Sequence, residues 1–209
     1  MSEIVQLHHV IDGELVDSID GQRFDSVNPA TQQVWATAPR GSLADADRAV
    51  TAARRAFDEG PWPRMSPDER GAALHRLADL MVANADELAR LDSVDMGKPL
   101  TQARTKDVPR SAHNFRFFAD FARMAEDECY PVASNHHIYT RYEPVGVTAA
   151  ISPWNFPLML ATWKVAPALA FGNTVVLKPA EQTPASCARL GELAIEAGVP
   201  PGVFNVVHG

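Results

Sequence analysis

The stretch from Pro144 to Trp163 constrains the fold more than any other, because it runs for 20 residues without a charged side chain. A helix of that length is long enough to cross a membrane. Pro144, Pro153 and Pro157 would interrupt such a helix and leave backbone groups unpaired in lipid. The stretch is therefore predicted to be a buried strand, a turn and a helix.

The same alternation continues to the last residue. Short apolar runs and helical periods follow one another as strand, helix, strand, helix and strand over residues 147–151, 157–171, 174–177, 183–198 and 203–207. Strands buried on both faces and joined by crossover helices form a parallel sheet. We predict an α/β fold in which residues 146–209 are the first half of a doubly wound, Rossmann-like nucleotide-binding unit.

Residues 1–129 are predicted to hold short N-terminal strands and then a mainly helical segment. Turn dipeptides such as Asp12-Gly13 separate the strands, and Ser42 and Ser66 have the sequence context of helix N-caps. A later helix is predicted to bury Phe115, Phe118, Phe121 and Ala122. Residues 137–143 alternate like a half-exposed strand, and residues 130–145 are predicted to form a β-hairpin arm.

Charge and composition exclude several classes of protein. The net charge of −7, from 19 basic and 26 acidic side chains, supplies no positive field for nucleic acid or an anionic membrane. The N-terminal residues lack the basic and apolar regions of a signal peptide, so we expect a cytoplasmic protein. Two cysteines, Cys129 and Cys187, are too few for a zinc cluster or disulfide framework, and we expect no metal.

Ligands of parallel sheets bind beyond the carboxyl ends of the strands. The turn after the first apolar run, from Ser152 to Pro157, contains Asn155 between two prolines. A carboxamide held there is suited to stabilise a developing oxyanion. The alternative is that Asn155 only caps the next helix, and its spacing alone favours the cap.

The turn after the second run contains Lys178 and Glu181, three residues apart. An acid in this place can accept both hydroxyls of a cofactor ribose. The alternative for the two is a solvated salt bridge within the loop. Trp163, on the intervening helix, is open to two interpretations, as a core residue or as a wall of a substrate pocket.

These residues form part of a long ordered string that resembles the aldehyde dehydrogenase superfamily over essentially the whole chain. It consists of PWNFP, TWKVAPALAFGNTVVLKPAEQTP and EAGVPPGVFNVVHG. The segment VPRSAHNFRFFADF further resembles the hydroxymuconic semialdehyde dehydrogenases of aromatic catabolism. The resemblance implies oxidation of a small-molecule aldehyde to a carboxylic acid with NAD(P)+, through a cysteine thiohemiacetal, hydride transfer and thioester hydrolysis.

The resemblance also implies roles for individual residues. Asn155 is the side-chain oxyanion donor, Lys178 and Glu181 bind the adenine ribose, and the residues lining the cofactor cleft are Ile151, Ser152, Pro153 and Trp154. A carboxylate at Glu181 would repel a 2′-phosphate, so NAD+ is expected rather than NADP+. Trp163 is expected to flank the aldehyde, and Arg110 to hold a substrate carboxylate. The alternative for Arg110 is a surface arginine beside Asp107.

The family's pattern continues beyond Gly209 with the glycine-rich turn, the general base and the nucleophilic cysteine, and no residue of this chain is assigned those roles. Three expectations follow. The isolated chain is inactive unless a second polypeptide supplies the remainder, residues 203–207 form an exposed sheet edge that promotes aggregation, and the arm serves homo-oligomerisation as in the family. The alternative function is a non-catalytic dinucleotide-binding or assembly module.

Overall fold

A computed structural model describes residues 4–131 and 135–209; the tip of the predicted arm, residues 132–134, lies outside the described residues. Its largest sheet has five strands in the order β3-β2-β10-β9-β8. The strands are β2 (His9–Ile11), β3 (Glu14–Val16), β8 (Val147–Ser152), β9 (Thr174–Pro179) and β10 (Phe204–Val206). Strands β8, β9 and β10 run parallel, while β2 is antiparallel to β10 and β3 to β2. The predicted α/β fold with a parallel sheet is confirmed.

The prediction of an exposed edge at residues 203–207 is wrong. Strand β10 lies between β9 and β2, and all three of its residues are buried. The antiparallel pairing of Val206 with Val10 supplies the neighbour that the sequence pattern did not reveal. Within the described residues the edges of this sheet are β3 and β8.

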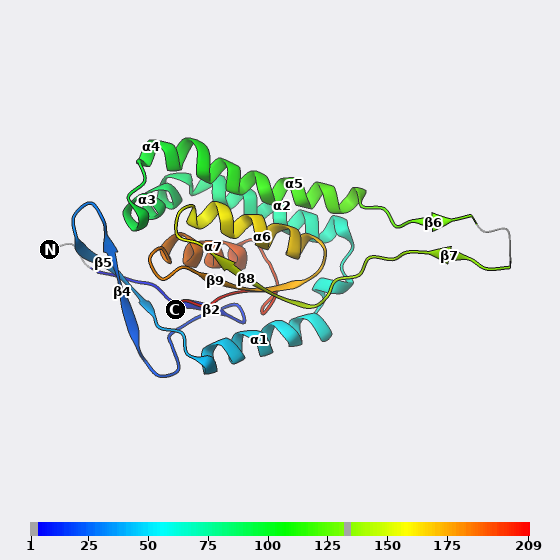
Figure 1. The fold of residues 1–209 in the computed structure, drawn as a ribbon, viewed down its shortest axis with the longest axis horizontal. Coiled ribbons are helices and arrows are strands. Elements are labelled where there is room, and N and C mark those ends of the chain that lie inside the picture. The colour runs from blue at the N-terminus through cyan, green and yellow to red at the C-terminus, as the bar shows by residue number, and fades with distance from the viewer. Residues whose placement is uncertain (1–3, 132–134) are drawn as a thin grey trace.

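Helices cover both faces of the sheet. They are α1 (Leu43–Asp58), α2 (Pro67–Ala83), α3 (Ala85–Met96), α4 (Leu100–Gln102), α5 (Val108–Met124), α6 (Pro157–Ala170) and α7 (Ala185–Glu196), with a 3₁₀ turn η1 (Trp62–Arg64) and a π-helical turn η2 (Ala103–Asp107). Figure 1 shows α1 on one side of the sheet and α2, α5, α6 and α7 on the other. The predicted N-caps Ser42 and Ser66 both form capping boxes, with Asp45 and Glu69 respectively.

The core is divided by the sheet because neighbouring strand residues point to opposite faces. Val176 packs with Ile11 and the alanines of α1, whereas Val175 and Leu177 belong to the larger cluster beneath α2, α5, α6 and α7. Phe115 and Ala122 are buried as predicted, and Phe118 packs partly buried against the core. Phe121 is 49% exposed, so that prediction is wrong; its ring stacks on Phe117.

Two smaller sheets complete the fold. One contains β1 (Val5–Gln6), β4 (Arg23–Asn28) and β5 (Gln33–Pro39) in the order β1-β5-β4. The other is the antiparallel pair β6 (Cys129–Tyr130) and β7 (Ile138–Tyr139), which extends far from the body of the molecule (Figure 1). The predicted hairpin arm is therefore present in the described residues. No helix among those residues combines the length and apolarity that a membrane crossing requires.

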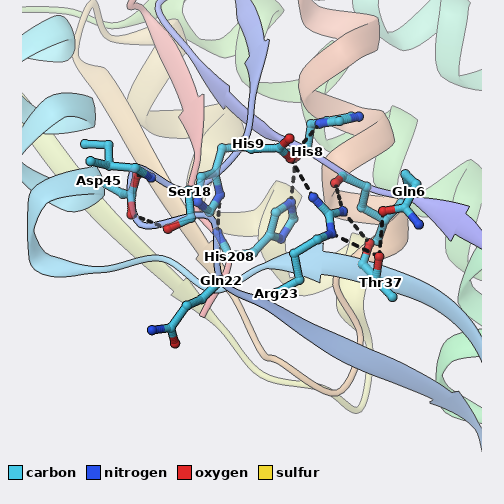
Figure 2. A network of polar contacts seen from close by, with 12 residues as sticks. Gln6, His8, His9, Ser18, Gln22, Arg23, Thr37, Asp45 and His208 are labelled. Atoms are coloured by element: carbon cyan, nitrogen blue, oxygen red, sulfur yellow. Dashed lines mark hydrogen bonds and ion pairs between the residues drawn. The ribbon is translucent and has the colours of Figure 1, made fainter.

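A buried polar network holds the end of β10 against the N-terminal strands (Figure 2). The backbone N–H of His208 donates to Nδ1 of His9 at 3.1 Å, and Nε2 of His208 donates to the carbonyl oxygen of His8 at 3.0 Å. The rings of His9 and His208 stack with 5.7 Å between centroids. Arg23 joins the network to the second sheet by donating to the carbonyl oxygens of Leu7 and Thr37.

Candidate active site

The carboxyl ends of β8 and β9 lie side by side at one edge of the main sheet. Their register pairs Ile151 with Lys178 and Ser152 with Pro179. Ile151 is 68% exposed and Trp154, in the following turn, is 57% exposed. Large apolar side chains exposed together at a strand end mark a surface suited to a flat, partly apolar ligand.

Ser152 differs from its neighbours in the sequence. Its side chain is buried, whereas Pro153 and Trp154 are exposed. The Ser152 hydroxyl is therefore not presented to a ligand, and only its backbone is available to line a cleft. The turn offers the side chains of the residues on either side of Ser152 instead.

Glu181 lies in the turn after β9 with its carboxylate exposed. Its Oε2 is 3.5 Å from Nζ of Lys178, and its Oε1 accepts from Gln182 at 3.3 Å. A hydrogen bond from its own backbone N–H, together with attraction to Lys178, lowers the pKa of Glu181. The loop salt bridge considered from the sequence is thus present. Both contacts are long and solvent-exposed, which leaves the ionised carboxylate able to exchange them for ligand hydroxyls.

Residues from both turns line one cavity of about 930 Å³. Trp154 from the first turn and Glu181 from the second both line it, and Arg40 and Gly209 lie at other parts of its wall. Of the residues that the sequence singled out in these turns, Trp154 and Glu181 therefore share one hollow, whereas Asn155 and Lys178 are not among the residues that line it. Its size falls within the range of small-molecule and cofactor sites.

Asn155 is exposed and does not cap helix α6. The N-cap position of α6 is occupied by Phe156, with no side-chain hydrogen bond to the helix. The interpretation of Asn155 as a cap is therefore wrong. Within the described residues the carboxamide makes no hydrogen bond, so its N–H groups are free to meet a ligand oxygen.

A second cavity, of about 400 Å³, lies between α5 and α6. Arg110 and Trp163, the two predicted substrate residues, both line it. Arg110 is also exposed on the surface of α5, as the alternative of a helix-surface arginine near Asp107 requires, although the Asp107 carboxylate itself is paired with Lys98. Behind the cavity, Asn114 Nδ2 donates to Thr162 Oγ1 at 2.9 Å and ties the two helices together.

The smaller cavity also contains residues that the sequence reasoning missed. His113 and Phe117 line it on the same face of α5 as Arg110. Their spacing of three and seven residues from Arg110 is the spacing of one helical face, and that signal could have identified them. The cavity therefore combines a guanidinium and an imidazole with aromatic walls.

The two cysteines have different surroundings. Cys187 is fully buried in α7, where burial raises the pKa of its thiol far above the usual range, as its predicted structural role requires. Cys129 is exposed on the arm, with its Sγ 3.6 Å from Nε2 of His137. Among the residues that the structure describes, no three His, Cys, Asp or Glu side chains are grouped so that they could hold a metal ion.

Comparisons with known proteins agree with these features. Residues 15–209 match the aldehyde dehydrogenase family. The chain is 48% identical over 208 residues to aldehyde dehydrogenase family 2 member B4, mitochondrial, of Arabidopsis thaliana, covering 98% of the chain and 39% of that protein. It is also 48% identical over 208 residues to 2-hydroxymuconic semialdehyde dehydrogenase of Pseudomonas sp. (strain CF600), covering 98% of the chain and 43% of that enzyme.

Solved structures give the same picture. An apo structure of indole-3-acetaldehyde dehydrogenase matches with a TM-score of 0.96 and 42% identity, over 100% of this chain and 48% of the other. The NAD+ complex of an aldehyde dehydrogenase from Bacillus cereus matches with a TM-score of 0.96 and 43% identity, over 98% and 42%. The chain thus spans less than half the length of the proteins it matches.

Proposed function

The chain belongs to the aldehyde dehydrogenase family, and from this premise we propose that it supplies the cofactor-binding side of an NAD+-dependent oxidation of an aldehyde to a carboxylic acid. The observation that carries the proposal is the cavity shared by Trp154 and Glu181 at the ends of two parallel strands. NAD+ supplies the hydride acceptor when bound. Ile151, Pro153 and Trp154 line its cleft, and Lys178 and Glu181 hold the adenine ribose.

Glu181 sets the choice between the two nicotinamide cofactors. Its lowered pKa keeps the carboxylate ionised, and it lies at a strand end where ribose hydroxyls would be accepted. A 2′-phosphate would meet like charge there, so NAD+ is preferred over NADP+. Calorimetric titration of the 209-residue chain is expected to give tighter binding of NAD+, and Glu181→Gln is expected to weaken NAD+ by about three- to tenfold.

Glu14→Gln is the matched control for this titration, because Glu14 is exposed on β3 at the opposite edge of the sheet. It is expected to leave both affinities unchanged. Equal affinities of the unmodified chain for NAD+ and NADP+, or an effect of the control as large as that of Glu181→Gln, would contradict the assignment.

Asn155 stabilises the oxyanion that develops on the aldehyde carbon's oxygen. The support for this role is that the carboxamide is exposed and makes no hydrogen bond in the described residues. It also lies between the two cavities: Trp154, the preceding residue, lines the larger cavity, and the helix that follows carries Trp163, which lines the smaller one. Loss of one such donor typically lowers kcat by about 100- to 1,000-fold. The role is tested by joining residues 1–209 to the remaining part of the Pseudomonas sp. enzyme and following NADH formation with Asn155→Ala.

The aldehyde is proposed to be a hydroxymuconic-type semialdehyde that carries a carboxylate. Arg110, unpaired among the described residues, would hold that carboxylate in the smaller cavity, and Trp163 would flank the carbon chain. In the same chimera, Arg110→Gln is expected to raise KM for a semialdehyde carboxylate at least tenfold and leave KM for benzaldehyde unchanged. An equal rise for both substrates would refute a carboxylate site.

The 209-residue chain by itself is expected not to catalyse the reaction, because it offers no candidate nucleophile: Cys187 is buried and Cys129 lies on the arm. Sustained NADH formation from an aldehyde and NAD+ by this chain alone would overturn that expectation. For activity, a complementing polypeptide would have to supply the nucleophile. The cytoplasmic location stays a prediction.

The arm is proposed to mediate contact between subunits. Tyr130, Ile138 and Tyr139 are 47%, 48% and 61% exposed on strands β6 and β7, away from the body of the molecule. Exposed apolar side chains on a projecting hairpin are typical of an interface. Sedimentation velocity is expected to show an oligomer that Ile138→Lys dissociates, and a monomer at all concentrations would contradict this role.

A further inference from the structure

A buried ion pair lies directly beneath the turn that carries Asn155. Lys98 follows the C-terminal end of α3, and its Nζ is paired with the Asp107 carboxylate at the end of η2. Both side chains are only 5% exposed. The same Nζ is 3.7 Å from the centroid of the Phe156 ring, which is the distance of a close cation–π contact.

The local chain geometry directs Lys98 to this place. Gly97 ends α3 in the left-handed conformation, with φ of 77°, and turns the chain back toward the protein. The Ser93 hydroxyl donates to the carbonyl oxygen of Lys98 at 2.7 Å and holds the backbone there. A charge is costly to bury, and Asp107 compensates it in part. The aromatic face of Phe156 provides a further favourable contact.

The turn above has few other contacts. Phe156 makes no side-chain hydrogen bond as the N-cap of α6, and the backbone bond from Leu160 N–H to the Phe156 carbonyl oxygen, at 2.9 Å, starts the helix. From helix α7, the Cys187 thiol approaches the Pro157 carbonyl oxygen at 3.7 Å. Asn155 itself has no hydrogen bond in the described chain. With no hydrogen bond of its own, the carboxamide is held through the backbone of the turn, which continues directly into Phe156.

We propose that Lys98, anchored by Asp107, is a positioning residue that fixes the ring of Phe156 and thereby the direction of the Asn155 carboxamide. The inference rests on the proposed function of Asn155 as an oxyanion donor. Positioning in advance matters there, because a donor that must reorganise during the reaction loses much of its effect. Lys98 touches neither the substrate nor the cofactor in this proposal and acts only through Phe156.

The test uses the 209-residue chain and does not depend on activity. Its readouts are the side-chain amide resonances of Asn155 in a ¹⁵N-labelled sample, assigned by their loss in Asn155→Ala, and hydrogen exchange of the Leu160 amide. Phe156→Leu removes the ring and leaves the ion pair in place. It is expected to shift the Asn155 resonances and to speed Leu160 exchange roughly tenfold. Phe156→Tyr keeps a ring, so the Asn155 resonances and the Leu160 exchange rate are expected to be those of the unmodified chain.

Lys98→Met is expected to act like Phe156→Leu, and Lys106→Met is its control, because Lys106 is an exposed lysine in the segment next to Asp107. If Lys98→Met fails to fold, Phe156→Leu still decides. Unchanged Asn155 resonances in folded Lys98→Met or in Phe156→Leu, or no recovery in Phe156→Tyr, would overturn the inference. Full kcat in Asn155→Ala of the chimera would instead refute the proposed function, so the two failures are distinct.

Discussion

The stacked pair of His9 and His208 makes the stability of the chain sensitive to acid. Both residues are buried; Nδ1 of His9 accepts from the His208 backbone, which requires that nitrogen to be unprotonated, and Nε2 of His208 donates to the His8 carbonyl oxygen. Burial, with the neighbouring His9 ring, lowers the pKa of His208 to about 3. Burial also lowers the pKa of His9, against the attraction of Asp45.

The sign and size of the effect follow from linkage. An unfolded histidine takes up a proton near pH 6.5, whereas folded His208 does so only near pH 3, so the free energy of unfolding falls as the pH drops through this window. pH 5 lies about 1.5 units below the pKa of an unfolded histidine, so protonation of the unfolded chain lowers the free energy of unfolding by about 2 kcal/mol. The full loss, reached near pH 3, is about 5 kcal/mol, comparable to the total stability of many domains.

The variant His208→Gln removes the titration and keeps an N–H that can donate to His8. Urea unfolding followed by circular dichroism at pH 7.5 and pH 5 is expected to show that the unmodified chain loses about 2 kcal/mol more than this variant. The exposed His75, which contacts Asp120, provides the control His75→Gln, expected to behave like the unmodified chain. Equal losses in His208→Gln and the unmodified chain would refute the reasoning.

Three further predictions concern stability. Burial raises the pKa of Asp92 to about 7, so the folded chain keeps a proton that the unfolded chain releases near pH 4; urea titrations are expected to show a loss of about 2 kcal/mol between pH 5 and 7 that Asp92→Asn avoids. Trp62→Phe removes the buried bond to the Leu169 carbonyl oxygen and is expected to cost about 1–3 kcal/mol, against less than about 0.5 kcal/mol for the exposed Trp154→Phe. Ser66→Ala removes a capping box and is expected to lower the thermal midpoint by a few degrees, for a cost of about 1 kcal/mol. The first prediction would be contradicted by the same pH dependence in Asp92→Asn and the unmodified chain, and the second by equal costs of the two tryptophan substitutions. An unchanged thermal midpoint in Ser66→Ala would contradict the third.

The features that could be predicted from the sequence are those set by local interactions. The capping boxes at Ser42 and Ser66 involve residues three apart, and the chain's alternating apolar runs depend on the period of each element alone. Asn155 and Glu181 could be singled out because the carboxyl ends of parallel strands lie at one edge of a sheet. None of these inferences needed to know which distant segments pair.

The features that could not be predicted depend on contacts between distant parts of the chain. The pairing of Val206 with Val10 joins segments near the two ends of the sequence, and no local sequence pattern predicts it. Phe121 has the helical spacing of a buried residue, yet the core ends before it and the ring stacks on Phe117 instead. The Lys98 contact with Phe156 was missed for the same reason, since it joins the end of α3 to the start of α6.

The position of β8 explains why the Asn155 turn needs support from below. In the strand order β3-β2-β10-β9-β8, β8 is an edge strand, which in the described residues pairs only with β9. A turn that follows an edge strand is held from one side, and its other contacts must come from side chains beneath it. Lys98 and Asp107 provide such a contact through Phe156, from helices that precede β8 in the chain. The geometry of the proposed oxyanion donor is therefore set by the α3 and α5 region as much as by the strand that leads to it.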